Sequence, residues 1–455
     1  MTINFAAAEA ALADMVQEGM ARLGVPGLAI GLLHGDETYT VGFGVTNLNH
    51  PLPVEADTLF QIGSTSKTIT ATTAMRLVEM GQLDLEAPIK TYLPDLRLAD
   101  EAATDRATLS HLFTHTGGWL GDYFDDFGRG DDALTKMVAA MAKLPQLTPL
   151  GQIWSYNNAG FYLAGRIIEA VTGQTYEAAV KELVLDPLGM THSVFLAEEA
   201  IIHRVAVGHI VYPDRVEVAQ PWALARTANP AGGVISNVTD QLRYARFHLG
   251  DGRAADGQRL LRPESLAAMQ TPRAAAGSMA EEVGLTWLMR RVAGTRLVMH
   301  GGATNGQLSA FVLVPERQFA LTVLTNANRG RELNAEITAW ALQHYLGLAE
   351  PEATPLTLST AALAEYAGHY QAALSKIDLS LSEGTLWLQS IPQGGFPKPD
   401  SPPGPTPPPV RLAFSAEDRV IGLDPPFTNQ RGEFLRDEAG RIVWFRFGGR
   451  IHARA

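Results

Sequence analysis

Strand-like patterns stand at both ends of the first 350 residues, and a mainly helical pattern separates them. The segment 25–47 carries apolar residues around a Gly-Asp turn, which predicts two strands. Between the ends, apolar residues recur at helical spacing, as at 161–173. Strand signals return from about residue 284, in the segments 284–292, 297–302, 308–316 and 319–328. We therefore expect one discontinuous α/β unit, an antiparallel sheet flanked by helices, with an all-α insertion.

The last hundred residues carry a different pattern. After a linker-like stretch at 349–358, short alternating segments separated by turn residues predict a small antiparallel β-barrel domain. The expected domains are residues 1–350 and 356–455. The segment 397–409 has 8 prolines in 13 positions, which excludes a central strand and predicts an extended loop. Because the linker is short, we expect the β domain to restrict a cleft or to build an oligomer.

Composition excludes several classes of protein. The 455 residues contain no cysteine, so disulfides, thiolate metal sites and a cysteine nucleophile are excluded. A net charge of -12 argues against broad binding to nucleic acid or anionic membranes. The sequence has no run of about 18 uncharged apolar residues, so no membrane span is predicted. The acidic residues Glu9, Asp14 and Glu18 argue against a secretory signal, so we expect a soluble, cytoplasmic protein.

A Ser-x-x-Lys motif, Ser64 to Lys67, is the first candidate for chemistry. A helix is predicted to begin at this point, which puts Ser64 at a helix N-terminus and Lys67 on the same face. Free N–H groups there favour an oxyanion, and a desolvated lysine with a lowered pKa is able to take the serine proton. The alternative interpretation is a helix cap beside a surface lysine.

Two further motifs follow along the chain. Tyr156 and Asn158 lie just before a predicted helix; a phenol near a lysine can shift toward phenolate and relay protons, and an Asn can hold an amide carbonyl. His300 ends a predicted strand, and the glycines after it, among them Gly302, let backbone approach a ligand. The Ala303 N–H is then a candidate oxyanion donor. Taken alone, each motif also fits a structural role.

The segments around these motifs share one resemblance. They are LFQIGSTSKTITA, ATLSHLFTHTGGW, WSYNNAGFYLAGRIIEAVTG, DPLGM, NPAGGVISNVTDQLRYA, GLTW and HGGATNGQLSAFVLVPE. With the three motifs in this order, the chain resembles the serine β-lactamase and penicillin-binding-protein superfamily. The resemblance is to its class C-like branch of D-peptidases, D-aminopeptidases and esterases, over about residues 5–348. The C-terminal region is similar, more loosely, to the lipocalin-like barrel appended to some members.

The resemblance implies a role for each candidate residue. Ser64 would be the acylated nucleophile. Lys67 would be its general base in concert with Tyr156, which would pass a proton to the leaving group and help to activate the hydrolytic water. Asn158 would orient the substrate amide. The N–H groups of Ser64 and Ala303 would form the oxyanion hole.

His300 departs from the pattern of the family. Many relatives carry lysine there, in a Lys-Thr-Gly motif, and Gly301 also replaces the hydroxyl residue. Because histidine is only partly charged near pH 7, the expected grip on a β-lactam carboxylate is weak. We therefore expect a serine hydrolase that cleaves small peptides or amides, of D-peptidase, carboxypeptidase or aminopeptidase type. A carboxylesterase, and a weak β-lactamase or non-hydrolytic penicillin-binding sensor, are the alternatives.

The expected partners are a short peptide or ester substrate, β-lactams as covalent ligands and, as an open alternative, further copies of this chain. No cofactor or metal is expected. His111 and His115 have a spacing that suits a metal, but no third ligand is in view, so we interpret both as structural. The acidic loop 121–132 is interpreted as solvated, or alternatively as a cleft rim. Trp154 and Trp222 are interpreted as core residues, with cleft lining as the alternative.

Overall fold

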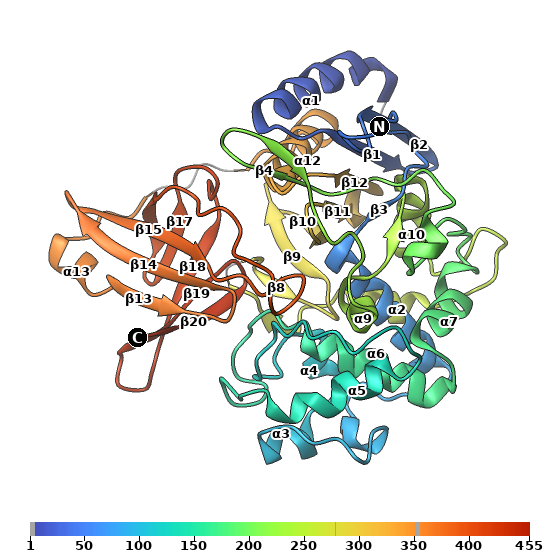
Figure 1. Cartoon of the computed structure of the whole chain (residues 1–455), viewed down its shortest axis with the longest axis horizontal. Coiled ribbons are helices and arrows are strands. Elements are labelled where there is room, and N and C mark those ends of the chain that lie inside the picture. The colour runs from blue at the N-terminus through green and yellow to red at the C-terminus, as the bar shows by residue number, and fades with distance from the viewer. Residues whose placement is uncertain (1–4, 278, 351–354) are drawn as a thin grey trace.

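The computed structural model describes residues 5–277, 279–350 and 355–455 (Figure 1). Strands from both ends of the first 350 residues form one antiparallel, eight-stranded sheet, which confirms the predicted discontinuous unit. Across the sheet the strands are β2 (Glu37–Gly44), β1 (Gly27–His34), β12 (Phe319–Thr325), β11 (Leu308–Val314), β10 (Thr295–Ala303), β9 (Leu288–Val292), β8 (Glu282–Val283) and β7 (Ala274–Ala275). Ile30 of β1 lies opposite Val323 of β12, so early and late segments of the chain share one sheet.

Helices cover both faces of this sheet. Side chains alternate along a strand, and β1 accordingly sends Leu28, Ile30 and Leu32 into one apolar cluster and Ala29 and Leu33 into another. The first cluster packs under two helices, α1 (Glu9–Leu23) and α12 (Gly330–Leu346). The second continues under α10 (Val238–Leu249) into the helical region. The helical region therefore shares its core with the sheet.

The helical region lies between β2 and β7 in the chain. Besides α10, its helices are α2 (Ser66–Glu79), α3 (Glu101–Arg106), α4 (Leu109–Phe113), α5 (Ala133–Ala140), α6 (Ala159–Thr172), α7 (Tyr176–Val180), α8 (Ala197–Ala200), α9 (Asn229–Gly232) and α11 (Pro263–Met269). Two small sheets pair β3 (Phe60–Gln61) with β6 (Ile235–Ser236) and β4 (His209–Val211) with β5 (Val216–Val218). Nearly all of α2 is buried, which places the Ser-x-x-Lys segment at the centre of this part of the molecule. Among the described residues, no helix combines the length and apolar character needed to cross a bilayer.

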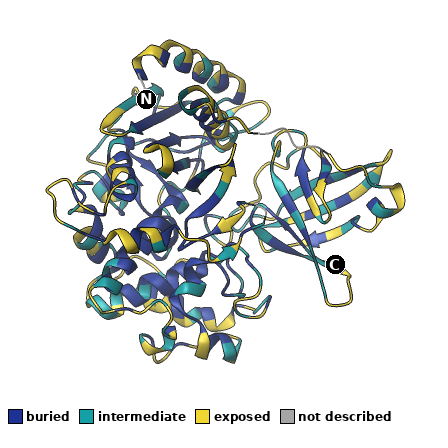
Figure 2. Cartoon of the chain, turned by 180° about the vertical axis from the view of Figure 1, so that it is seen from behind, coloured by how far each residue is buried: buried dark blue, intermediate teal, exposed yellow. Residues whose placement is uncertain are grey.

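The C-terminal strands form a closed antiparallel barrel, as predicted. They are β13 (Gly368–Gln371), β14 (Ser375–Ser382), β15 (Thr385–Pro392), β16 (Val410–Ala416), β17 (Arg419–Gly422), β18 (Arg431–Arg436), β19 (Ile442–Phe447) and β20 (Arg450–Arg454), preceded by α13 (Thr360–Ala364). Large apolar side chains such as Phe414, Phe434 and Phe445 pack inside the barrel as a core. Figure 2 shows that buried and more exposed positions alternate along the barrel strands. The proposed boundary at 350–356 stays a prediction, because residues 351–354 lie outside the described residues.

The turns of the barrel fall at two opposite ends, because successive strands run in opposite directions. The near rim, next to the helical region in Figure 1, consists of the connections 372–374, 393–409, 423–430 and 448–449. The far rim consists of the connections 383–384, 417–418 and 437–441. The proline-rich segment 397–409 contains no strand, as expected, and belongs to the near rim.

Candidate active site

Ser64 lies in the 3-10 turn Gly63–Thr65 that leads into α2. Backbone of β10 runs directly against this turn. A Cβ on Gly63, whose φ is +52°, would lie 2.6 Å from Ala303 N, and a Cβ on Gly302 would lie 2.7 Å from Ser64 N. Only glycine fits at both positions. The glycines therefore let β10 approach the turn that carries Ser64, so the backbone nitrogens of Ser64 and Ala303 lie on facing segments. The expected approach of this backbone to a ligand stays a prediction.

Lys67 lies one turn further along and is completely buried. Its Nζ lies 3.1 Å from Ser64 Oγ, 2.7 Å from Asn158 Oδ1 and 2.6 Å from the Ala231 carbonyl oxygen. Burial is the main cause that holds the pKa of Lys67 well below its ordinary value, so the neutral amine is favoured. A neutral amine has two N–H donors and one lone pair. In the neutral form the two carbonyl oxygens accept these N–H groups and the lone pair is left for the serine hydroxyl, whereas the protonated amine donates to all three oxygens.

Tyr156 is buried beside the same lysine, whose Nζ is 5.0 Å from the centre of the phenol ring. Burial raises the pKa of Tyr156, while a hydrogen bond with Ser64 and the charge of Arg450 act in the opposite direction without reversing the shift. The sequence-based expectation of a shift toward phenolate is therefore wrong, because desolvation penalises the anion more than the neighbouring cation favours it. Burial therefore favours the neutral form of both Tyr156 and Lys67.

His300 is also buried, at 2% exposure, and uncharged. Burial is the largest cause that lowers its pKa to about 3, and Lys67 adds to it. The Nδ1 atom lies 2.7 Å from the Gly301 carbonyl oxygen, so Nδ1 carries the proton of the neutral ring. The Nε2 atom is then an acceptor, and it is buried without a partner among the described residues. The lowered pKa means that this side chain presents no positive charge to the site near pH 7.

Asn158 is held on two sides, by Lys67 and by an acidic residue that sequence reasoning had assigned to the surface. Its Oδ1 accepts from Lys67 Nζ, and its Nδ2 donates to Asp122 Oδ1 at 2.9 Å. The side chain of Asp122 is only 5% exposed and forms an ion pair with Arg450 of the barrel. The interpretation of loop 121–132 as solvated is thus wrong for Asp122, because a cation from the distant end of the chain compensates its burial.

The turn between β19 and β20 is the part of the barrel that contacts Ser155 and Tyr156. Gly448 and Gly449 have φ values of +56° and +80°, as a two-residue hairpin loop requires. The Gly449 carbonyl accepts from Tyr156 N at 2.8 Å, and Ile451 N donates to Ser155 Oγ at 3.4 Å. The Gly-Gly pair after an alternating segment is a readable hairpin signal. What that hairpin contacts is not readable from local sequence.

His115 and His111 have separate roles. The His115 ring stacks on Tyr156 with 4.4 Å between ring centres, and its Nδ1 accepts from Asn157 N at 3.0 Å. His111 instead caps its own helix, where its Nδ1 contacts Thr108. In the part of the chain that the structure describes, no three His, Asp or Glu residues are arranged to hold a metal ion. The interpretation of both histidines as structural agrees with these contacts.

A cavity of about 250 Å³ lies beside the turn Gly63–Thr65. Its lining includes Gln61, Asp126, Phe195, Trp222, Gly232 and Lys398. A Cβ on Gly232 would lie 3.6 Å from the Gly63 carbonyl carbon, which shows how close the cavity is to Ser64. Lys398 comes from the proline-rich loop of the near rim, and the neighbouring Phe396 packs on Phe124 with 5.0 Å between ring centres. Trp222 therefore lines the cleft, whereas Trp154 is buried next to Tyr156.

Known proteins resemble both parts of the chain. The family model described as Beta-lactamase matches residues 12–345. Penicillin-binding protein 4 of Amycolatopsis lactamdurans is 34% identical over 355 residues, which cover 76% of this chain and 93% of that protein. The crystal structure of SurE has a TM-score of 0.77 at 25% identity and covers 99% of this chain and 100% of its own. The D-amino acid amidase from Ochrobactrum anthropi has a TM-score of 0.59 at 26% identity and covers 70% of this chain and 90% of its own.

Proposed function

Because the chain belongs to the β-lactamase family of serine hydrolases, we propose that it cleaves small peptides or amides containing a D-amino acid through an acyl-enzyme on Ser64. One observation carries the proposal. The buried Lys67 Nζ lies 3.1 Å from Ser64 Oγ, and Asn158 Oδ1 and the Ala231 carbonyl oxygen can accept both N–H groups of the neutral amine, which leaves its lone pair for Ser64. That arrangement is what an amine needs in order to act as a base toward a serine.

In the proposed acylation, Ser64 Oγ attacks the substrate carbonyl carbon while its proton passes to Lys67 Nζ. The N–H groups of Ser64 and Ala303 hold the oxyanion of the tetrahedral intermediate. When the intermediate collapses, the C–N bond breaks and the leaving amine takes a proton, supplied from Lys67 through the Tyr156 hydroxyl. Deacylation repeats these steps with water as the nucleophile, so that the acid is released and Ser64 recovers its proton.

Two features support an amide with a D-residue over a β-lactam. The neutral His300 provides no charge for a β-lactam carboxylate. Among the similar structures is one of a D-amino acid amidase, a protein named for this substrate class. Lys398 of the near rim also lines the cavity of about 250 Å³ beside Ser64, which favours small substrates.

Labelling by a fluorophosphonate probe tests the nucleophile. The wild-type protein and the control Ser110→Ala, altered on a separate helix, are expected to react, and Ser64→Ala is expected to show no labelling. Lys67→Met should lower the rate of labelling by roughly 10²- to 10⁴-fold, the usual contribution of a general base. Labelling of Ser64→Ala at another serine would refute the assignment.

The substrate class is tested by kcat/KM on paired D- and L-amino acid amides and on p-nitrophenyl esters of short acids. We expect the D-amides to exceed their L-partners by at least about tenfold, which is about 1.4 kcal/mol of transition-state discrimination. Equal values for the two series, with esters far above both, would establish the esterase alternative instead. An acyl adduct that persists for hours in intact-mass spectra would establish the sensor alternative.

A further inference from the structure

An unbroken line of polar contacts connects the barrel to the proposed nucleophile. On β20, Arg450 binds both oxygens of Asp122, Nη2 to Oδ1 at 3.0 Å and Nε to Oδ2 at 3.1 Å. Asp122 Oδ1 accepts from Asn158 Nδ2 at 2.9 Å, and Asn158 Oδ1 accepts from Lys67 Nζ at 2.7 Å. Arg450 thus holds Asp122, Asp122 holds Asn158, and Asn158 holds Lys67.

We propose that Arg450 is a positioning residue of the active site, so that the barrel completes the catalytic centre and is not an accessory to it. The inference rests on the proposed function, in which Lys67 is the base. Arg450 fixes the Asp122 carboxylate, Asp122 fixes the Asn158 amide, and Asn158 takes one N–H of Lys67 so that the lone pair stays on Ser64. Guanidinium suits this task because its planar fork matches a carboxylate at two points.

The burial of Asp122 makes the guanidinium necessary. A carboxylate that is 5% exposed needs a partner, because an unpaired buried charge is strongly destabilising. Across residues 5–277, 279–350 and 355–455, Arg450 is the cation paired with Asp122. Burial lowers the pKa of Arg450, but Asp122 more than offsets this effect, and the pKa is raised overall. The guanidinium is therefore charged at every working pH.

The charges around Lys67 show what the loss of Arg450 would do. Burial is the largest cause of the lowered pKa of Lys67. The charge of Arg450 lowers this pKa further, and the charge of Asp122 raises it. His115 and His300 face the same space, and burial lowers the pKa of both rings, which favours their neutral forms. Without Arg450, the charge of Asp122 would act unopposed and would favour protonated Lys67, which has no lone pair for Ser64.

The position of Arg450 does not depend on Asp122 alone. Its guanidinium carbon lies 4.7 Å from the centre of the Tyr156 ring, within cation–π distance. The residue before it, Gly449, accepts from Tyr156 N at 2.8 Å. A Cβ on Gly449 would lie 2.3 Å from Met279 Sδ, so the hairpin is seated tightly against the catalytic part. Three anchors of different kinds therefore hold the hairpin in place.

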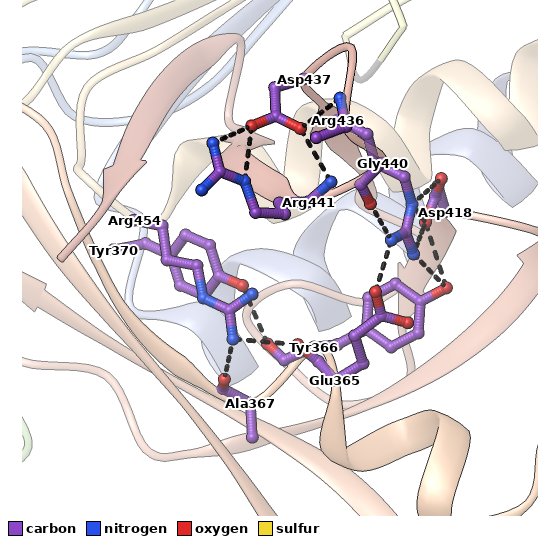
Figure 3. Close-up of polar contacts among 11 residues, drawn as sticks. Glu365, Tyr366, Ala367, Tyr370, Asp418, Arg436, Asp437, Gly440, Arg441 and Arg454 are labelled. Carbon is purple, nitrogen blue, oxygen red and sulfur yellow. Dashed lines mark hydrogen bonds and ion pairs between the residues drawn. The ribbon is translucent and has the colours of Figure 1, made fainter.

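The experiment compares Arg450→Met and Arg450→Lys with a far-rim control, Arg436→Met. Arg436 binds Asp418 at 2.9 Å with the same fork, but entirely within the barrel (Figure 3). The measurement is the second-order rate of Ser64 labelling by a fluorophosphonate probe from pH 5 to pH 10, in the full-length proteins. This readout needs no knowledge of the natural substrate.

For Arg450→Met we expect labelling at pH 7 to fall roughly 10- to 100-fold, and the acidic limb of the profile to move up by about one pH unit. Arg450→Lys should keep the limb near its wild-type position, because it keeps the charge, while its rate falls less. Arg436→Met should leave the profile unchanged. In Asp122→Asn/Arg450→Met, removal of the carboxylate should return the limb toward lower pH.

Three results would overturn the proposal: a wild-type profile in Arg450→Met, the same shifted profile in Arg436→Met, or a double variant in which the two effects simply add. Intact secondary structure by circular dichroism is required of each variant, and Arg450→Lys carries the comparison if Arg450→Met fails to fold. If instead Ser64→Ala is labelled as fast as the wild type, the proposed function fails and the role of Arg450 is refuted with it. The two failures are therefore distinguishable.

Discussion

At the far rim of the barrel, Arg436 binds Asp418 and also reaches Glu365 and Tyr366, all within the last hundred residues (Figure 3). At the near rim, Arg450 makes the same two-point contact with Asp122, 328 residues earlier in the chain. The chemistry is identical, but the far-rim cation ties barrel segments to one another and the near-rim cation ties the barrel to Lys67. One fold thus has a rim that stabilises itself and a rim that serves a site elsewhere.

The two rims also differ in what their glycines meet. Gly440 of the far rim has a φ of +78° and open space around its missing Cβ. Gly449 of the near rim has a φ of +80°, but a Cβ there would collide with Met279. Both glycines adopt a left-handed backbone, but only Gly449 lacks space for a side chain. Residues of one type on the two rims should therefore respond differently to the same substitution.

The largest expected effect comes from Gly449→Val. The added side chain should push the hairpin away from Met279, break the contact with Tyr156 N and displace Arg450, and labelling of Ser64 should fall about 100-fold. In the matched Gly440→Val, we expect a loss of about 1–2 kcal/mol in the free energy of unfolding from the left-handed backbone, with labelling unchanged. Equal losses of activity in the two variants would remove the distinction between the rims.

Acid should destabilise the catalytic part more than the barrel. Burial lowers the pKa of His248 and His300 to about 3 in the catalytic part and that of His452 to about 4 in the barrel. Below the ordinary value of about 6.5, the unfolded chain binds protons that the folded chain does not, so stability falls as pH drops from 6.5 toward 4. At pH 5 the loss is about 2 kcal/mol for each such histidine.

Urea unfolding at pH 7 and pH 5 measures this loss. In His248→Gln the difference between the two pH values should shrink by about 2 kcal/mol, whatever the stability of the variant at pH 7. His452→Gln is the barrel counterpart, with the same sign of effect. An unchanged pH dependence in His248→Gln would contradict the assignment of a neutral buried ring.

Phe396→Ala tests the proline-rich part of the near rim. Loss of the ring contact with Phe124 should cost about 1 kcal/mol and loosen the loop over the cavity. We expect KM for bulky amides to fall roughly fivefold with kcat nearly unchanged, because a looser loop admits larger substrates while the reacting groups are untouched. Phe124→Ala should give the same result, and the two changes together should not add. A fall in kcat alone would mean that the loop acts on the chemistry.

The smallest effect is expected from Arg431→Gln. Its pair with Glu281 joins the near rim to the catalytic part at 3.6 Å, but both side chains are 41% exposed. Exposed pairs of this kind contribute about 0.5 kcal/mol or less, so neither stability nor labelling should change measurably. A large loss of labelling would show that docking of the whole rim depends on surface charge.

Much of the fold and part of the site were predictable because their signals are local. Strand signals after residue 284 predicted the late strands of the sheet, and the family resemblance of the motifs implied that Ser64 and Ala303 lie together. The pairing of Asp122 with Arg450 was not predictable, because the two residues are 328 positions apart and the sequence around each does not indicate its partner. The direction of the Tyr156 pKa was missed for a related reason. The pKa shift depends on how deeply the whole fold buries Tyr156, whereas the local sequence shows only the residues next to it in the chain.

The chain order of the site has a consequence for protein synthesis. Arg450 is translated 386 residues after Ser64, which at about 5–20 residues per second is a delay of about 20–80 s. In the later part of that interval, after Thr325, all strands of the sheet have been translated and the serine motif has left the ribosome. Lys67, the proposed base, would still lack the contacts that Arg450 supplies through Asp122 and Asn158 until β20 is made and the barrel closes. A nascent chain would therefore stay nearly inert toward peptides around it, and activity would switch on only after the barrel had folded.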